Sequence, residues 1–431
     1  MEAFSIAILL VSFLLLLSIG TPVAWSITIS SLFTLLVSVP FLPALTTISQ
    51  RMATGIDSFA LLAIPFFILS GELMNKGGVA HRLVAFAKSL VGFLPGGLAL
   101  INVISAMLMG SVAGSAMASA SAMGSILGPE MEKEGYSKGF GVAINITSAT
   151  TGLVIPPSNI LIVYSLASGG ASIAALFLAG YIPGILTGLF LMAVAMIWAK
   201  KKNFKTGKRA PLKTVFNSFV RAFPSLMLLF VVIGGIVSGV FTATEASAIA
   251  VIYTLVLGFV YKEITFKTLP SILLKSSTTT AIVMFLIGAS MSMSWVLSYE
   301  NIPEMISSGI LSLSDNKIVI LLLINFTLLF VGIFMDMTPA VLIFTPIFLP
   351  IVTQLGIDPV HFGIIMILNL CIGLCTPPVG SVLFVGVGVA NTSIQKVIKP
   401  LIPLFLAMIV ALLLVTYIPA LSLWLPSIFG L

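Results

Sequence analysis

The chain has 431 residues, of which 59% are hydrophobic and only 8% are charged. A soluble protein carries about 25% charged residues, so this chain has too few charges to cover the surface of a soluble domain. With a mean hydropathy of +1.22, the composition excludes a soluble enzyme, a nucleic-acid-binding protein and a disordered chain. Long apolar runs without strict alternation predict an all-α integral membrane protein rather than a membrane β-barrel.

The first apolar run lacks both a basic leading segment and a small-residue cleavage site, so we interpret it as a true span and not as a signal peptide. Two amphipathic stretches, 77–95 and 298–316, carry charges or helix breakers and are expected to lie along the membrane interface as helices. The predicted spans, ten in all, are 4–20, 22–42, 57–75, 138–168, 171–199, 223–241, 244–261, 276–297, 360–394 and 400–428.

Two further apolar stretches, 98–134 and 318–356, are too long for one span and have small or polar residues at their centres. The first breaks at Gly110–Ser115 and the second at Met335–Pro339. Each pattern predicts a re-entrant hairpin, in which two half-helices enter and leave the membrane on the same side.

An internal repeat relates the two halves of the chain. After a shift of 221 residues, 126–173 align with 347–394 without a gap and with 11 identities in 48 positions, among them Pro156-Pro157 with Pro377-Pro378. The predicted organisation is a first repeat at 1–199, a cytoplasmic linker at 200–222 and a second repeat at 223–431. Each repeat holds five crossings, an odd number, so the second must be inverted in the membrane.

The distribution of basic residues agrees with this inversion. With the N-terminus outside, 18 of the 20 lysines and arginines fall in inner segments, including the cluster between Lys200 and Lys213. Only Arg51 and Lys317 lie outside. This asymmetry follows the positive-inside rule and predicts that both termini face outward.

Each hairpin is followed by a span that a proline pair interrupts. Proline removes a backbone N–H and frees the carbonyl four residues earlier, so each break should face the preceding hairpin tip. Carbonyl and hydroxyl oxygens suit a hard cation such as Na⁺, and free N–H groups at helix starts suit a carboxylate. Inverted repeats with broken helices are typical of secondary transporters.

The chain resembles the large permease subunit of the tripartite ATP-independent periplasmic (TRAP) transporters, the DctM-like family. The residues that carry the resemblance include Leu62–Leu69, Gly71, Gly77-Gly78, Gly110-Ser111, Gly114-Ser115, Ile155–Ser158, Gly239–Ala246 and Thr376–Pro378. The resemblance implies a sodium-driven importer of organic acids, such as dicarboxylates, keto acids or sialic acids, in the bacterial inner membrane. It also implies an elevator-type fold and two partners: a small four-helix membrane subunit and a periplasmic substrate-binding protein.

Candidate site residues follow from the paired breaks. The expected sodium ligands are Ser111, Gly114, Ser115, Pro156, Asp336, Thr338, Thr376 and Pro377, and the expected substrate contacts are Ser158, Asn159, Gly380 and Ser381. Asp336 has a second interpretation as a helix cap, and Glu72 and Glu245 are expected to have structural roles. No arginine lies at mid-membrane, so recognition of a carboxylate is expected to use backbone dipoles, hydroxyls and amides.

Two alternatives remain open at this point. A sodium/proton antiporter or another sodium-coupled carrier would use the same cation sites without a binding protein. An intramembrane enzyme is disfavoured because no catalytic motif is found, and an ATP-driven permease because no P-loop is found. For an elevator, we expect the hairpins with the fourth and ninth spans to move against a scaffold made of the remaining spans.

Overall fold

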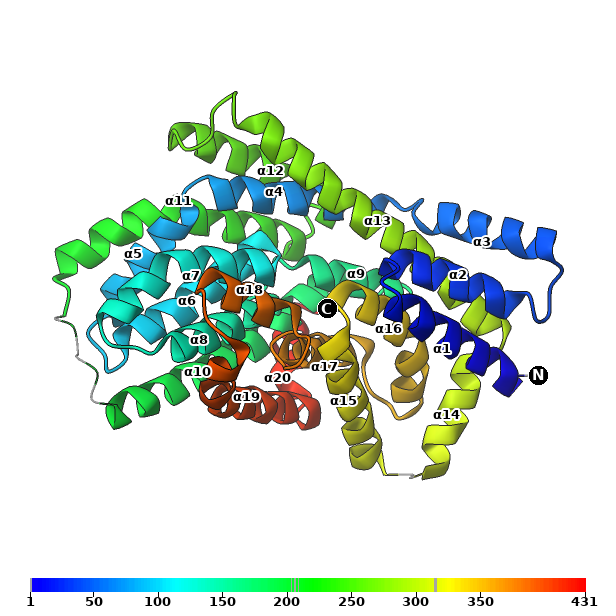
Figure 1. Ribbon diagram of the computed structural model, residues 1–431. Helices are drawn as coiled ribbons and strands as arrows, with labels where there is room; N and C mark the ends of the chain where they lie inside the picture. Colours follow the sequence, from blue (N-terminus) through cyan, green and yellow to red (C-terminus); the bar gives the residue numbers. More distant parts are fainter. Residues whose placement is uncertain (1, 203, 205–206, 208, 314–315) are drawn as a thin grey trace.

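The computed structural model describes residues 2–202, 204, 207, 209–313 and 316–431, and every regular element in them is a helix. This confirms the all-α prediction (Figure 1). Lys205, Lys208 and Asp315, which contribute to the charge asymmetry, lie outside the described residues.

The first repeat runs from α1 to α10. Its helices are α1 (Glu2–Ser18), α2 (Val23–Leu35), α3 (Phe41–Gly55), the 3-10 helix η1 (Phe59–Leu62), α4 (Ala63–Lys76), α5 (Val79–Val91), α6 (Gly97–Ala113), α7 (Ala116–Lys133), α8 (Lys138–Thr151), α9 (Asn159–Ala167) and α10 (Ile173–Lys201). The predicted interfacial helix is α5, and the predicted first hairpin is α6 with α7.

The second repeat follows a similar order, but one long helix, α13, takes the place of α3, η1 and α4, and a further helix, α20, follows at the end. Its helices are α11 (Leu212–Val237), α12 (Ala243–Val260), α13 (Leu269–Tyr299), α14 (Ile302–Leu313), α15 (Lys317–Phe334), α16 (Met337–Gln354), α17 (Pro359–Gly373), α18 (Ser381–Val389), α19 (Ile394–Tyr417) and α20 (Ala420–Ile428). The two arm helices lie at opposite ends of the molecule, α5 on the left and α14 on the right in Figure 1. This placement fits the predicted inversion of the second repeat.

Four predicted boundaries are wrong. The span at 22–42 ends at Leu35, and a separate amphipathic helix, α3, follows Pro40. Helices α11 and α13 begin at Leu212 and Leu269, earlier than predicted, so α11 takes up the end of the predicted linker. The last predicted span is divided into α19 and α20, because the chain leaves the helix at Ile418, just before a proline.

Length and composition alone do not settle how many helices cross a membrane. In the described part of the chain, eight helices are long and apolar enough to do so, and both helices of the second hairpin, α15 and α16, are among them. The two proline-broken spans do not qualify as single helices. The expected re-entrant character of α15 and α16 therefore stays a prediction that rests on the polar break between them.

Polar residues define several helix starts. The side chains of Ser137 and Ser172 accept hydrogen bonds from the first-turn amides of α8 and α10. At the start of α12, Thr242 and Glu245 form a reciprocal capping box. The structural role expected for Glu245 is confirmed.

Glycine pairs let each hairpin lie against the broken helix that follows it. A Cβ atom at Gly152 would come within 2.8 Å of the Gly110 Cα, and one at Gly373 within 2.6 Å of the Gly332 Cα. In both repeats, the first hairpin helix thus crosses the first half of the broken helix at a pair of glycines. Such close contact is typical of helix packing in membranes.

The hairpins and broken helices form one packed body, which we call the hairpin body. Within it the repeats interlock, because α9 of the first repeat packs against α16 of the second and α18 packs against α7. Helices α10 and α19 also pack against α8 and α17. Our assignment of the fifth and tenth spans to the scaffold is therefore corrected: by packing, they belong with the hairpins.

The remaining helices form a second group, the scaffold, made of α1 to α4 and α11 to α13. Helix α13 packs against α2, α3 and α4, and α12 packs against α4 and α11. The arms α5 and α14 connect the scaffold to the hairpins in the chain. The two groups meet mainly where α4 contacts α6 and α9 and where α13 contacts α16.

Candidate binding site between the hairpin tips and the scaffold

One cavity of about 370 Å³ lies between the hairpin body and the scaffold. Both hairpin tips reach it, so the two sites expected from the two repeats open into a single space. Six of the predicted site residues line the cavity: Gly114, Ser115, Asn159, Asp336, Thr338 and Ser381. The other six, Ser111, Pro156, Ser158, Thr376, Pro377 and Gly380, are not part of its wall.

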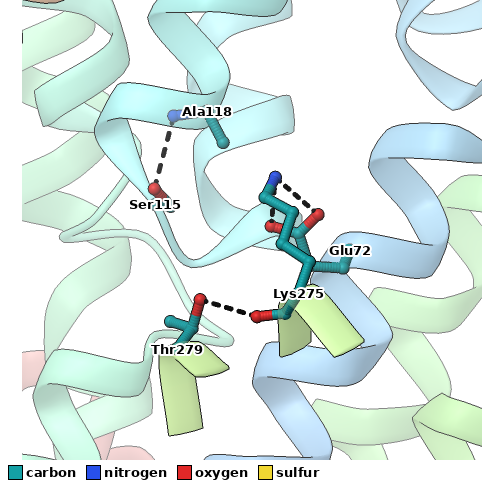
Figure 2. Close-up of polar contacts among 5 residues, drawn as sticks. All are labelled: Glu72, Ser115, Ala118, Lys275 and Thr279. Carbon is teal, nitrogen blue, oxygen red and sulfur yellow. Dashed lines mark hydrogen bonds and ion pairs between the residues drawn. The ribbon is translucent and has the colours of Figure 1, made fainter. Parts of the chain in front are cut away.

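The first tip is a glycine followed by a serine. Gly114 ends α6 in the left-handed conformation, with φ +59°, which a side chain would disfavour. A Cβ atom there would also lie 2.6 Å from the Asn159 amide nitrogen, so this glycine lets the tip contact the start of α9. Ser115 caps α7 by accepting a hydrogen bond from the Ala118 N–H at 3.3 Å (Figure 2).

The second tip carries a charge. Asp336 caps α16 by accepting a hydrogen bond from the Met337 N–H at 2.9 Å, and its side chain is exposed. Thr338 follows in the first turn of α16 and lines the same wall. The cap interpretation of Asp336 is confirmed, and the same residue lines the cavity.

The proline breaks satisfy much of their own backbone. Ser158 donates a hydrogen bond to the Leu153 carbonyl at 2.5 Å, and the Val382 N–H donates to the Leu374 carbonyl at 3.3 Å. The Thr376 carbonyl accepts from the Gly380 N–H at 3.0 Å. The Ser158 hydroxyl is thus directed at its own loop, which argues against the substrate contact that we expected.

Ser111 also turns inward. It is fully buried, and its hydroxyl donates to the Leu108 carbonyl at 2.9 Å. By contrast, the Ser381 hydroxyl is a buried oxygen with no hydrogen-bond partner among the described residues, and Ser381 lines the cavity. A buried polar atom without a partner is costly, so Ser381 is the stronger candidate for a ligand contact.

The opposite wall contains two residues that the sequence analysis did not place in the site. Lys275 on α13 donates a hydrogen bond to the Oε2 atom of Glu72 on α4 at 2.8 Å, and its Nζ atom forms an ion pair with the Oε1 atom, also at 2.8 Å (Figure 2). The Lys275 side chain is 55% exposed, whereas that of Glu72 is 15% exposed. The scaffold therefore presents a half-exposed ammonium group to the cavity, a charged group that the expected recognition by backbone dipoles, hydroxyls and amides did not include.

Helical spacing explains how these residues reach the cavity. Ile64, Ile68 and Glu72 are four residues apart on α4, and Lys275, Thr279 and Val283 are four apart on α13. Residues at this spacing share one face of a helix. The spacing within α4 and within α13 could have shown from the sequence that each helix has a face with a charged residue at one end. Nothing in the sequence shows that these two faces meet in the folded chain.

The cavity wall carries groups of both charges. Its hairpin side offers one carboxylate, three hydroxyls and one amide, whose oxygen atoms are hard donors suited to a monovalent or divalent cation of low polarisability. Its scaffold side offers an ammonium group, which suits an anion. Among the described residues, no group of three histidine, cysteine or acidic side chains could form a transition-metal centre.

Comparison with known structures shows which fold the chain has. The crystal structure of the YdaH transporter from Alcanivorax borkumensis is similar, with a TM-score of 0.66 and 15% identity, over 91% of this chain and 90% of that one. The two chains therefore share one all-helical fold.

Sequence comparison identifies the family. Residues 10–421 match the family described as "Tripartite ATP-independent periplasmic transporter, DctM component", and the chain belongs to this family. The resemblance seen in the sequence motifs is confirmed, and so is the expectation that the chain is a transporter subunit and not an enzyme.

Three relatives illustrate the match. YgiK of Salmonella typhimurium is 56% identical over 427 residues, which cover 99% of this chain and 98% of that protein. The C4-dicarboxylate TRAP transporter large permease protein DctM of Pseudomonas aeruginosa is 40% identical over 376 residues, 87% and 88% of the two chains. The sialic acid TRAP transporter large permease protein SiaM of Vibrio cholerae is 38% identical over 382 residues, 88% and 89% of the two chains.

Proposed function

We propose that this chain is the large permease subunit of a sodium-coupled importer of an organic acid anion in the bacterial inner membrane. The observation that carries the proposal is the single cavity in which hairpin oxygens face the Lys275 ammonium. A carboxylate substrate would approach Lys275, while Na⁺ would be held at the tips. Relatives that transport C4-dicarboxylates and sialic acid support this substrate class.

Sodium would bind at two places on the cavity wall. The first is the tip formed by Gly114 and Ser115, next to the Asn159 amide. The second is the tip formed by Asp336 and Thr338, with Ser381 on the same wall. Binding of Na⁺ at Asp336 would neutralise the carboxylate and so favour the arrival of an anion. This provides a physical reason for coupling between the ion and the substrate.

An elevator movement fits the division into two packed groups. The hairpin body carries both tips, and the scaffold carries Lys275 and Glu72. If the hairpin body slides against the scaffold, the proposed ion ligands move with it while the Lys275 ammonium stays in place. The substrate would then leave Lys275 and form other contacts during the movement. Movement of the loaded body as one unit keeps the broken helix ends satisfied.

Two partners complete the proposed transporter: a small four-helix membrane subunit beside the scaffold and a periplasmic protein that delivers the substrate. We would reconstitute the permease with the small subunit in proteoliposomes and measure uptake of labelled dicarboxylates, keto acids and sialic acid. Uptake should require an inward sodium gradient and the binding protein. Equal uptake in potassium, or sodium/proton exchange without any organic acid, would overturn the proposal and favour an antiporter.

A further inference from the structure

A second, larger pocket lies away from the hairpin tips, between the arm α5 and the scaffold. It has a volume of about 840 Å³ and is open to the surface. Helices α5 and α11 pack side by side at the left of Figure 1, and the segment that follows α12 closes the third side. This is the end of the molecule at which the charge distribution places the cytoplasm.

The polar groups of this pocket carry a net positive charge. Arg82 and Arg221 line it together with the carboxylate of Glu263, so two positive charges and one negative charge leave a sum of +1. Among the residues that the structure describes, neither arginine forms an ion pair. Arg82 is held in place, because its guanidinium stacks 3.6 Å from the centre of the Tyr261 ring and donates to the Gly78 carbonyl at 2.7 Å.

The pocket also offers neutral hydrogen-bond donors. Thr214 and Asn217 of α11 line it, and so does Tyr261, whose buried hydroxyl has no partner among the described residues. A planar guanidinium with hydroxyl and amide donors around it is a typical binding environment for a phosphate group.

Beside the pocket, α11 presents large apolar side chains to the outside. Phe216 is 66% exposed, Val220 51% and Phe230 71%. These residues follow one another from the first turns of α11, next to the pocket, toward its far end. The surface therefore combines a cationic recess with an apolar strip that leads away from it, which matches the headgroup and the acyl chains of one lipid molecule.

We propose that an anionic phospholipid binds here, with its phosphodiester between Arg82 and Arg221 and its acyl chains along α11. The net charge of −1 on an anionic phospholipid balances the net charge of the pocket, whereas the ammonium group of a zwitterionic headgroup cancels its phosphodiester charge and leaves the pocket uncompensated. Basic pockets between helices on the cytoplasmic side are suited to such headgroups. This site is separate from the transport cavity, and it does not depend on the identity of the substrate.

The site lies at the joint between the scaffold and the arm. Gly78, which lines the pocket, has a positive φ of 68° at the corner between α4 and α5, and α5 leads directly into the first hairpin. A lipid that holds α5 against α11 fixes one side of this joint. The rate of transport should therefore depend on anionic lipid.

The test compares wild type with Arg221→Gln, using Lys267→Gln as a control on an exposed lysine outside the pocket. The purified full-length permease is incubated with phosphatidylglycerol in mild detergent, and retained lipid is measured by native mass spectrometry. We expect about fivefold less retention in Arg221→Gln, the effect of one basic residue at an anionic headgroup, and no loss in Lys267→Gln. Equal retention in all three proteins overturns the proposal.

A second measurement reads the effect on transport. Uptake is compared in vesicles of phosphatidylcholine alone and in vesicles that also contain phosphatidylglycerol. We expect phosphatidylglycerol to raise the rate for wild type and Lys267→Gln but not for Arg221→Gln. If free inorganic phosphate replaces the lipid in either assay, or if the small membrane subunit covers the pocket and excludes the lipid, the site is not a lipid site.

Discussion

Both hairpin tips join two helices at the cavity, but their side chains differ in charge. Each ends one helix and starts another at the wall of the cavity, and each caps the second helix with a side-chain oxygen. The first tip consists of Gly114 in the left-handed conformation and the neutral Ser115. The second consists of Met335 in an extended conformation and Asp336, whose side chain is a carboxylate. The backbone geometry is thus shared between the repeats, but only the second tip contributes a charge.

The two repeats share the close packing of their helices but differ in the charge at their hairpin tips. Close packing is duplicated, since Gly110 and Gly152 meet in the first repeat as Gly332 and Gly373 do in the second. Ion chemistry is not duplicated, because a carboxylate interacts with Na⁺ more strongly than a hydroxyl does. The two proposed sodium sites should therefore differ in affinity, with the Asp336 site the tighter one.

The largest effect is expected where the repeats agree. A methyl group at Gly152 or Gly373 would press against backbone atoms of the hairpin, and such overpacking costs about 1–3 kcal/mol. We expect Gly152→Ala and Gly373→Ala each to abolish transport and to lower the melting temperature in detergent. Gly128→Ala is the control, because no atom lies within 4 Å of its added carbon. Normal uptake by both variants would show that the glycine crossings are unimportant.

Removing the charge of the second tip should have the next largest effect. Asp336→Asn keeps an oxygen that can cap α16 but loses the carboxylate. Because interactions of a charged group contribute about 1.5–3 kcal/mol, the sodium concentration for half-maximal uptake should rise about tenfold. Ser115→Ala at the first tip should raise it less, by about threefold. The comparison of the tips fails if the serine variant has the larger effect.

The cation on the scaffold should act on the substrate and not on sodium. Lys275→Gln removes the ammonium from the cavity wall, and we expect the KM for the organic anion to rise about fivefold at an unchanged sodium requirement. Glu72→Gln frees Lys275 from its ion pair and should lower the KM. Parallel changes of the sodium requirement and the substrate KM in Lys275→Gln would contradict this division of roles.

The smallest effect is expected at Thr338. Its hydroxyl makes no hydrogen bond with the described residues, so Thr338→Val leaves no partner unsatisfied and removes only a potential ion ligand. We expect sodium affinity to fall by about twofold to threefold, consistent with the loss of one neutral ligand, with an unchanged melting temperature. Thr392→Val is the matched control, because the Thr392 hydroxyl also has no hydrogen-bond partner among the described residues and lies outside the cavity wall. A lower melting temperature in Thr338→Val would indicate a structural role.

The helix ends at the hairpin tips could be predicted from the sequence, because they depend on residues close together in the chain. The tips were recognisable because Gly, Ser, Asp and Pro have strong preferences at helix ends, and each hairpin was predicted from its own long apolar run with a small or polar centre. The boundaries of α3 and α20 were not recognisable, because both helices are short or amphipathic and continue an apolar stretch.

Tertiary contacts account for what the sequence analysis missed. Glu72 and Lys275 lie far apart in the chain, and only the packing of α4 on α13 brings them together. The Ser158 hydroxyl shows a related effect: its residue type suits a ligand, but in the folded chain it donates a hydrogen bond to the Leu153 carbonyl. The placement of α10 and α19 also depends on long-range packing, which neither hydropathy nor the repeat encodes.

The most direct test of the account is a crosslink between the hairpin body and the scaffold. Val283 of α13 and Met337 of α16 both line the cavity, and these two helices pack against each other, so a disulfide between cysteines at these positions would hold the two groups together. Thr150→Cys with the native Cys375 is the control within the hairpin body, where the Thr150 hydroxyl lies 3.3 Å from the Cys375 sulfur. The account predicts that oxidation of Val283→Cys/Met337→Cys abolishes sodium-dependent uptake and that reduction restores it, while the control stays active. Complete crosslinking with unchanged uptake would contradict the elevator movement.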